Sequence, residues 1–265
     1  MASLSARALS AIPEVRPGDD LAELIFAALA GQPLLDGQLV AIAHTAVSKA
    51  EGALVDLADV RPSPRALELA AEADAAGQER NPRAVQVVLD ESVEVLRAVR
   101  GVLICRTRHG FICANAGVDA SNAAAEDGRE MLVLLPRDPD ASARRIRARL
   151  RELTGASTGD GRAPAVLITD SFGRAWRNGQ VDVAIGLAGM QPLDDWRGRT
   201  DASGMQLRAT WLAIADAAAG TADLARAKDS REPVVIIDGL QRFLTADDGP
   251  GASALLRPLR EDLFR

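Results

Sequence analysis

The chain has 265 residues, of which 48% are hydrophobic and 26% charged, so it can build a globular core as one large domain or two small ones. Its net charge of -6 argues against a general nucleic-acid binder, which usually carries a basic surface. No apolar run approaches the ~18 residues that a membrane span needs, and the segment before Pro13 lacks the apolar core of a signal peptide. We therefore expect a cytoplasmic protein with neither a nucleic-acid partner nor a membrane partner.

Helix signals come first along the chain. Asp19 or Asp20 is expected to cap a helix that ends at Gly31. Two later helices are expected where a capping residue precedes proline, at Ser63-Pro64 and at Asn81-Pro82, because proline is favoured at the first helical position. The second of these is expected to present an apolar face made of Val85, Val88, Leu89, Val93 and Leu96.

Short apolar runs predict the strands. They lie at Leu39–Ala43, Val102–Cys105, Phe111–Ala114, Met131–Leu135, Val166–Thr169, Val181–Leu187 and Val234–Ile237. Two more helices are expected, one capped by Asp140 and one through Leu207–Ala219. Because the strands outnumber the helices between them and the order is irregular, we expect an α+β fold with mixed or largely antiparallel sheets.

One stretch near the C-terminus bears on domain organisation. The run Asp247-Asp248-Gly249-Pro250-Gly251 has turn composition and predicts that a loosely attached tail follows. We therefore expect one domain at residues 1–245, with room for two subdomains, and a C-terminal tail at residues 246–265.

The cysteines and histidines are few. Cys105 and Cys113 make no disulfide framework and no zinc site, so we expect two buried thiols in a reducing compartment. His44 and His109 are the only histidines, and neither lies beside the signature of an activated nucleophile.

Two motifs place carboxylates after apolar runs, namely Asn115–Asn122 and Thr169–Gln180. If Asp119 and Asp170 converge, a divalent cation would allow both to stay ionised, and the hydroxyl of Ser171 offers another oxygen. Hard oxygen ligands of this kind suit Mg²⁺ or Mn²⁺. The alternative is that both aspartates are unrelated turn or cap residues, which spacing alone favours.

Basic residues supply possible phosphate contacts. Lys49 follows a predicted strand and could act as a point charge for phosphate, although a solvated surface lysine is the more common case. A polar run containing Arg174, Arg177, Asn178, Gln180 and Asp182 could bind an anion or form a solvated loop. Neither the P-loop pattern nor a strand-linked G-x-G-x-x-G occurs, so any nucleotide would bind by a less familiar arrangement.

Five blocks in order make the chain resemble a known family, the coenzyme F-420 gamma-glutamyl ligases. The blocks are Ile12–Leu21, Val47–Gly52, Asn115–Asn122, Thr169–Gly186 and Pro233–Leu240. Five ordered blocks are far more specific than any single one, and they favour the functional interpretation of Asp119, Asp170 and Lys49. The resemblance is to the stand-alone form, without the flavin-reductase domain that some bacterial relatives carry.

The resemblance implies GTP-dependent amide bond formation. The terminal carboxylate of a glutamate-free deazaflavin precursor takes the γ-phosphoryl group of GTP, and the amine of L-glutamate then displaces phosphate. A second glutamate follows by γ-linkage. Metal ions would neutralise the triphosphate, and a water-poor pocket would protect the acyl phosphate from hydrolysis. The family also implies Mg²⁺ or Mn²⁺, a monovalent cation such as K⁺, and a homodimer with an intertwined α+β fold.

Site residues follow from the resemblance by motif. Asp119, Asp170 and Ser171 take metal-ligand positions. Lys49 and Asn122 would contact GTP, and Asp119, Asp170 and Lys49 are the expected catalytic residues. The expected nucleotide site is completed by Ile12, Pro13, Glu14, Val15, His44, Thr45, Arg226, Ala227 and Lys228.

The sequence departs from the family pattern in three places. His44 stands where Ser, Thr or Gln is more usual, and Asp238 replaces an Arg before Gly239-Leu240. In the loop at Arg226–Lys228, Ala227 replaces a Gly, and Lys228 stands where some members have an acidic or amide metal ligand. The family implies one or two metal sites. A cation cannot ligate a metal, so the second of these sites would lack this ligand, and Lys228 could reach a phosphate instead.

Two other functions stay open at this point. A metal-dependent nucleotide phosphohydrolase could use the same aspartates, and it would turn over GTP without an acceptor. A degenerate homologue could bind nucleotide or deazaflavin without chemistry, which the altered loop at Ala227-Lys228 encourages.

Overall fold

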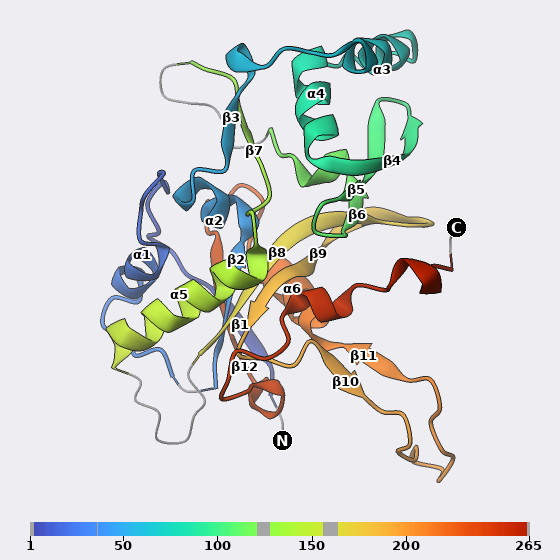
Figure 1. The fold of residues 1–265 in the computed structure, drawn as a ribbon. Helices are drawn as coiled ribbons and strands as arrows, with labels where there is room; N and C mark the ends of the chain where they lie inside the picture. Colours follow the sequence, from blue (N-terminus) through green and yellow to red (C-terminus); the bar gives the residue numbers. More distant parts are fainter. Residues whose placement is uncertain (1–2, 36, 121–127, 156–163, 264–265) are drawn as a thin grey trace.

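The computed structural model describes residues 3–35, 37–120, 128–155 and 164–263 (Figure 1). Its centre is a five-stranded sheet in the order β1-β12-β2-β8-β9. These strands are β1 (Ser5–Ala8), β12 (Val234–Asp238), β2 (Leu39–Ala43), β8 (Ala165–Arg174) and β9 (Arg177–Ala188). Only β2 and β8 run parallel, and the other neighbours are antiparallel. The expected α+β class with mixed, largely antiparallel sheets is confirmed.

Both faces of this sheet are covered, which explains the unbroken apolar sequence of β2. Val40 and Ile42 belong to the core beneath α1 (Leu21–Ala28), α2 (His44–Ala50) and α5 (Pro139–Thr154). Leu39 and Ala41 belong to a second core beneath α6 (Ile214–Ala225). Figure 1 shows α1, α2 and α5 grouped on one side of the strands.

A second group of elements comes from residues 54–133. It contains β3 (Leu54–Asp56), α3 (Pro64–Ala75), α4 (Pro82–Asp90), β4 (Ser92–Val99), β5 (Val102–Thr107), β6 (Ile112–Ala114) and β7 (Met131–Val133). β3 pairs with β7, while β4, β5 and β6 form a three-stranded sheet with its own small core under α3 and α4. This group lies at the top of Figure 1, above the central sheet.

The remaining elements are short. β10 (Leu193–Asp195) and β11 (Trp211–Ala213) form a two-stranded ribbon that projects from the body in Figure 1. The 3-10 helices are η1 (Leu57–Asp59), η2 (Asn115–Gly117), η3 (Gln241–Phe243), η4 (Ala252–Leu255) and η5 (Leu259–Glu261). None of the helices in the described ranges is both long enough and apolar enough to span a bilayer.

Two expected element boundaries were wrong. The helix that begins at Pro82 ends at Asp90, and the stretch containing Val93 and Leu96 is β4, paired with β5. The helix expected through Leu207–Ala219 begins only at Ile214, because residues 211–213 pair with β10. In both cases cross-strand pairing outweighs a local helical pattern.

The cap of α5 was also assigned to the wrong aspartate. Asp138 is the N-cap and accepts from the amide of Ala141. Asp140 instead accepts from the amides of Leu187 at 2.9 Å and Ala252 at 2.8 Å. It therefore ties α5 both to β9 and to the C-terminal segment.

Residues 245–255 are held on the domain, in contrast to the loose attachment expected from their sequence. The guanidinium of Arg147, only 1% exposed, donates to the carbonyls of Thr245, Ala246 and Asp247 and to the carboxylate of Asp248. Gly189 permits this geometry, because an added Cβ would lie 2.4 Å from Arg147 Nε. Ala252 completes the α6-side core.

We predict that Arg147→Met destabilises the protein by about 2–4 kcal/mol, because it leaves several carbonyls and the half-exposed carboxylate of Asp248 without their donor. Urea unfolding measures the loss. The matched control is Arg144→Met, an exposed arginine on the same helix, which should leave the midpoint nearly unchanged. Equal midpoints for the two variants would contradict the role given to Arg147.

Candidate active site

The parallel pairing of β2 with β8 builds the first part of the site. The last paired residues are Ala43 and Thr169, so His44 and Asp170 follow at the same edge of the sheet. His44 opens α2, is almost fully buried, and places Nε2 3.3 Å from Asp170 Oδ1. With its proton on Nε2, His44 can donate to this carboxylate, while Nδ1 has no partner in the part of the chain that is described.

Asp170 and Ser171 are adjacent in β8 but point to opposite faces, because side chains alternate along a strand. Ile168 and Phe172 share the face of Asp170 and belong to the core beneath α1, α2 and α5. Ser171 instead pairs directly with Asp182 of β9. The alternation of the strand opposes ligation of a single metal ion by both Asp170 and Ser171, and the expected metal-ligand role of Ser171 stays a prediction.

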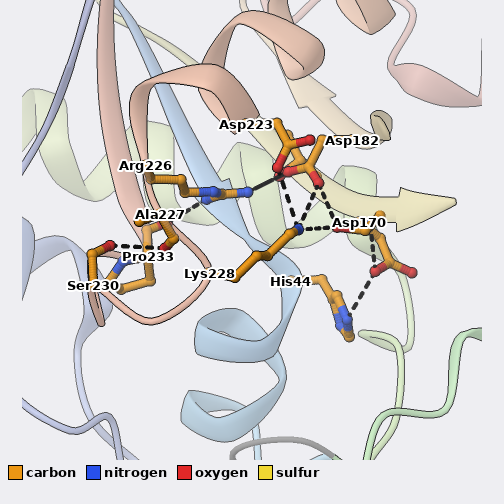
Figure 2. Close-up of polar contacts among 11 residues, drawn as sticks. His44, Asp170, Asp182, Asp223, Arg226, Ala227, Lys228, Ser230 and Pro233 are labelled. Carbon is orange, nitrogen blue, oxygen red and sulfur yellow. Dashed lines mark hydrogen bonds and ion pairs between the residues drawn. The ribbon is translucent and has the colours of Figure 1, made fainter. Parts of the chain in front are cut away.

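Asp182 is the centre of a buried polar cluster on the α6 face. Its side chain is 1% exposed and accepts from Thr169 Oγ1 at 2.8 Å and from Ser171 Oγ at 2.6 Å. Arg226, which follows α6, forms an ion pair with Asp182 and also donates to Thr169 Oγ1 and to the carbonyl of Pro233. Figure 2 shows this guanidinium directed at Asp182.

The charge state of Asp182 follows from these contacts. Burial alone would raise the pKa of its carboxyl, but the hydrogen bond from Ser171 and the charge of Arg226 outweigh burial and hold the pKa below the ordinary value. Asp182 therefore stays an anion at neutral pH and can form ion pairs with Arg226 and Lys228.

Lys228 reaches the same cluster from the loop after α6. Its Nζ lies 2.6 Å from Ser171 Oγ, 3.3 Å from Asp223 Oδ1 and 3.8 Å from Asp182 Oδ1 (Figure 2). The hydroxyl expected to be a metal ligand is thus engaged by a lysine ammonium. Ala227, between the two cations, is exposed, and its carbonyl accepts from Ser230 Oγ at 2.9 Å.

Lys49 and the N-terminal block also meet. Lys49, in the last turn of α2, forms an ion pair with Glu14. Val15 is buried in the same core as Val47 of α2, which fixes the segment from Ile12 to Val15 alongside this helix. Of the remaining expected nucleotide-site residues, Pro13 is exposed and Thr45 half-buried.

Asp119 lies beyond β6 and η2, where its backbone forms a bridge with Val133 of β7. Its amide donates to the carbonyl of Val133 at 2.9 Å, and the Asp119 carbonyl accepts in return at 2.8 Å. Asn122 lies outside the described residues. Within the described ranges no three His, Cys, Asp or Glu side chains form a group that could hold a metal ion. The convergence of Asp119 on Asp170 stays a prediction.

The two cysteines are buried and free, as expected, and are directly paired across β5 and β6. Burial, followed by the negative charge of Asp170, raises the pKa of Cys113 to about 12. Its thiol is therefore protonated and unreactive at neutral pH.

Sequence reasoning missed the cluster around Asp182. Asp182 stands out as a carboxylate between two valines in a strand whose alternation turns it inward, and this was a usable signal. Asp223 lies on α6, five residues before Lys228, and the two meet because the chain turns after the helix ends at Ala225. No local pattern marks it.

We predict that Asp182→Asn destabilises the fold by about 3–5 kcal/mol at neutral pH, since the buried guanidinium of Arg226 loses its counter-charge. Because the folded pKa of Asp182 lies below the ordinary value of 3.8, its contribution is present above that value and is lost as pH falls through the folded pKa. Urea unfolding of both proteins as a function of pH should show their difference shrinking on strong acidification.

The matched control is Asp195→Asn, whose partner Arg197 is exposed with it, and no measurable change is expected. A difference between wild type and Asp182→Asn that does not change with pH would contradict the electrostatic account.

Comparison with known proteins identifies the family of this chain. The family model described as F420-0:Gamma-glutamyl ligase matches residues 10–239. The chain is 43% identical over 257 residues to the coenzyme F420:L-glutamate ligase of Methanothermobacter thermautotrophicus, covering 96% of each chain. It is 44% identical over 254 residues to the ligase of that name from Methanopyrus kandleri, covering 95% of this chain and 94% of the relative. The relative from Halobacterium salinarum is 38% identical over 264 residues, with 99% and 96% covered. This chain belongs to the F420-0:gamma-glutamyl ligase family.

Proposed function

We propose that this protein uses GTP to join L-glutamate to the terminal carboxylate of a coenzyme F-420 precursor. The observation that carries the proposal is the family match, which spans nearly the whole chain at about two-fifths identity to proteins named as ligases of this kind. Lys49, His44, Asp170 and Arg226, which the sequence assigns to the site, lie on or directly after α2, β8 and α6.

The proposed reaction has two displacements. A carboxylate oxygen of the precursor attacks the γ-phosphorus of GTP, the bond to the β-phosphate oxygen breaks, and GDP leaves. The amine of L-glutamate then attacks the acyl carbon, loses a proton, and phosphate leaves. Repetition on the γ-carboxylate of the added glutamate gives a γ-linked chain. The reaction needs positioned charges for the phosphates and protection of the acyl phosphate from water.

We propose Asp170 and Asp119 as the residues that would hold Mg²⁺ or Mn²⁺. Both contacts described for Asp170 use Oδ1, from His44 and from the Ser171 amide, so Oδ2 can accept an ion. When bound, the ion would neutralise phosphate charge. Asp119 is half-buried and would approach from the loop after β6. We reassign Ser171 to the Asp182 cluster, where it already contacts Lys228 and Asp182.

Lys49 would exchange Glu14 for a phosphate oxygen when GTP binds. Its side chain is largely covered while Glu14 is mostly exposed, so the ammonium is held near the site by a partner that can move into water. His44 would orient Asp170 through the Nε2 contact. Thr45, Asn122 and the 12–15 segment complete the proposed nucleotide site, whereas Arg226 and Lys228 belong to the Asp182 cluster.

We also propose a homodimer, on the strength of the family and of apolar surface on the projecting ribbon. Trp211 and Leu212 of β11 and Met205 in the connecting loop are among the exposed large hydrophobic residues. Sedimentation equilibrium should give twice the 27.9 kDa chain mass, and a monomer at micromolar concentration would contradict this part of the proposal.

The purified chain, incubated with GTP, Mg²⁺ or Mn²⁺, L-glutamate and the glutamate-free precursor, should yield products that differ by glutamate residues in mass spectra. Asp170→Asn should remain folded and lose turnover by at least ~10³-fold, the size of several kcal/mol of lost charge stabilisation. GDP formed without any glutamate adduct would favour a hydrolase. Bound nucleotide without turnover would favour a non-catalytic homologue, and full activity of Asp170→Asn would remove Asp170 from the mechanism.

A further inference from the structure

The ammonium of Lys228 occupies a place lined by oxygen atoms from three different elements. Its neighbours are Ser171 Oγ of β8, Asp182 Oδ1 of β9 and Asp223 Oδ1 of α6, at 2.6, 3.8 and 3.3 Å. A lysine ammonium has three N–H donors and no acceptor, so it suits a position beside several oxygens that can accept hydrogen bonds. In Figure 2, Lys228 points up between the carboxylates of Asp182 and Asp223.

The charges in the cluster favour a second cation there. Asp182 and Asp223 carry two negative charges, and Arg226 supplies one positive charge. Arg226 engages Oδ2 of Asp182, whereas Oδ1 faces Ser171 and Lys228. Because the carboxylate of Asp182 is buried, an uncompensated charge on it would be costly. The ammonium therefore completes the neutralisation at an oxygen that Arg226 does not contact.

The spacing of the oxygens fits a large monovalent ion. Contacts of 2.6 to 3.8 Å are longer than the 2.0–2.1 Å typical of Mg²⁺. An ammonium ion and K⁺ are close in size, so oxygens arranged around one can accept the other. The Lys228 side chain is 71% exposed, so an ion would have a path to this position if the side chain were shortened.

We propose that Lys228 is a tethered substitute for a monovalent cation at the Ser171–Asp182–Asp223 oxygens. The protein fills this place with its own side chain and binds no free ion there. Removal of the ammonium creates a K⁺ site and makes the fold depend on K⁺. This inference concerns ion binding by the folded chain, so it stands or falls separately from the proposed reaction.

The test is thermal unfolding of wild type and Lys228→Met at constant ionic strength, in tetramethylammonium chloride with increasing KCl. Tetramethylammonium is much larger than K⁺ and has no N–H donor, so it serves as the inert salt. The wild-type midpoint should not depend on which cation is present. The Lys228→Met midpoint should be lower in tetramethylammonium and rise saturably with K⁺ by about 2–4 °C, the shift expected for a modest stabilisation of a chain of this size.

Two further variants sharpen the test. Lys228→Arg retains the positive charge and should behave like wild type. Lys228→Met combined with Asp223→Asn also removes the negative charge of one carboxylate, and this double variant should lose the K⁺ response. Ammonium chloride should replace KCl in rescuing Lys228→Met, because the ion it supplies is the group that was removed.

A count of bound ions provides a second readout. After equilibrium dialysis against Rb⁺, an ion of similar chemistry to K⁺, Lys228→Met should contain one more Rb⁺ per chain than wild type. If Lys228→Met is too unstable to purify, Lys228→Gln takes its place in the same measurement. Equal Rb⁺ content in wild type and variant, or a wild-type midpoint that depends on K⁺ as strongly as that of the variant, would overturn the proposal.

Discussion

The parallel pairing of β2 with β8 is the constraint on which the candidate site depends. It brings the start of α2 and the middle of β8 to one edge of the central sheet, so that His44 and Asp170 become neighbours although they are far apart in the sequence. β8 then continues beyond this edge as a long antiparallel hairpin with β9. The register slips between Ile168 and Thr169, where the site begins, and irregularities of this kind re-aim side chains beside functional sites.

Strand alternation then divides the polar residues between two faces. Asp170 and His44 lie on the α2 face, toward the side of Lys49 and Glu14, and this is the face to which we assign phosphate chemistry. Ser171 and Asp182 lie on the α6 face with Arg226 and Lys228. The α6 face carries a neutralised, internally bonded cluster, whereas Asp170 keeps an oxygen available for a ligand. Two adjacent residues of one motif thus serve two different purposes.

The sequence predicts four of the five strands of the central sheet, all but β1, and the starts of α1, α3 and α4, because burial patterns and capping residues are local signals. Asp20, Ser63 and Asn81 cap helices as expected. α2 escaped prediction because it has only seven residues and its N-cap, Ala43, offers no side-chain hydrogen bond. The pairing of Lys49 with Glu14 and the meeting of Lys228 with Ser171 and Asp182 arise from tertiary contacts, which no periodicity in the sequence encodes.

The separation of the two faces is tested most directly by crystals grown with Mn²⁺ and a non-hydrolysable GTP analogue, using anomalous scattering to locate the metal. The account predicts a manganese peak beside Asp170 Oδ2, with Asp119 and phosphate oxygens as further ligands. It also predicts that Lys228 Nζ remains on Ser171, Asp182 and Asp223. A manganese ion bound between Ser171 and Asp182, with Lys228 displaced, would contradict it.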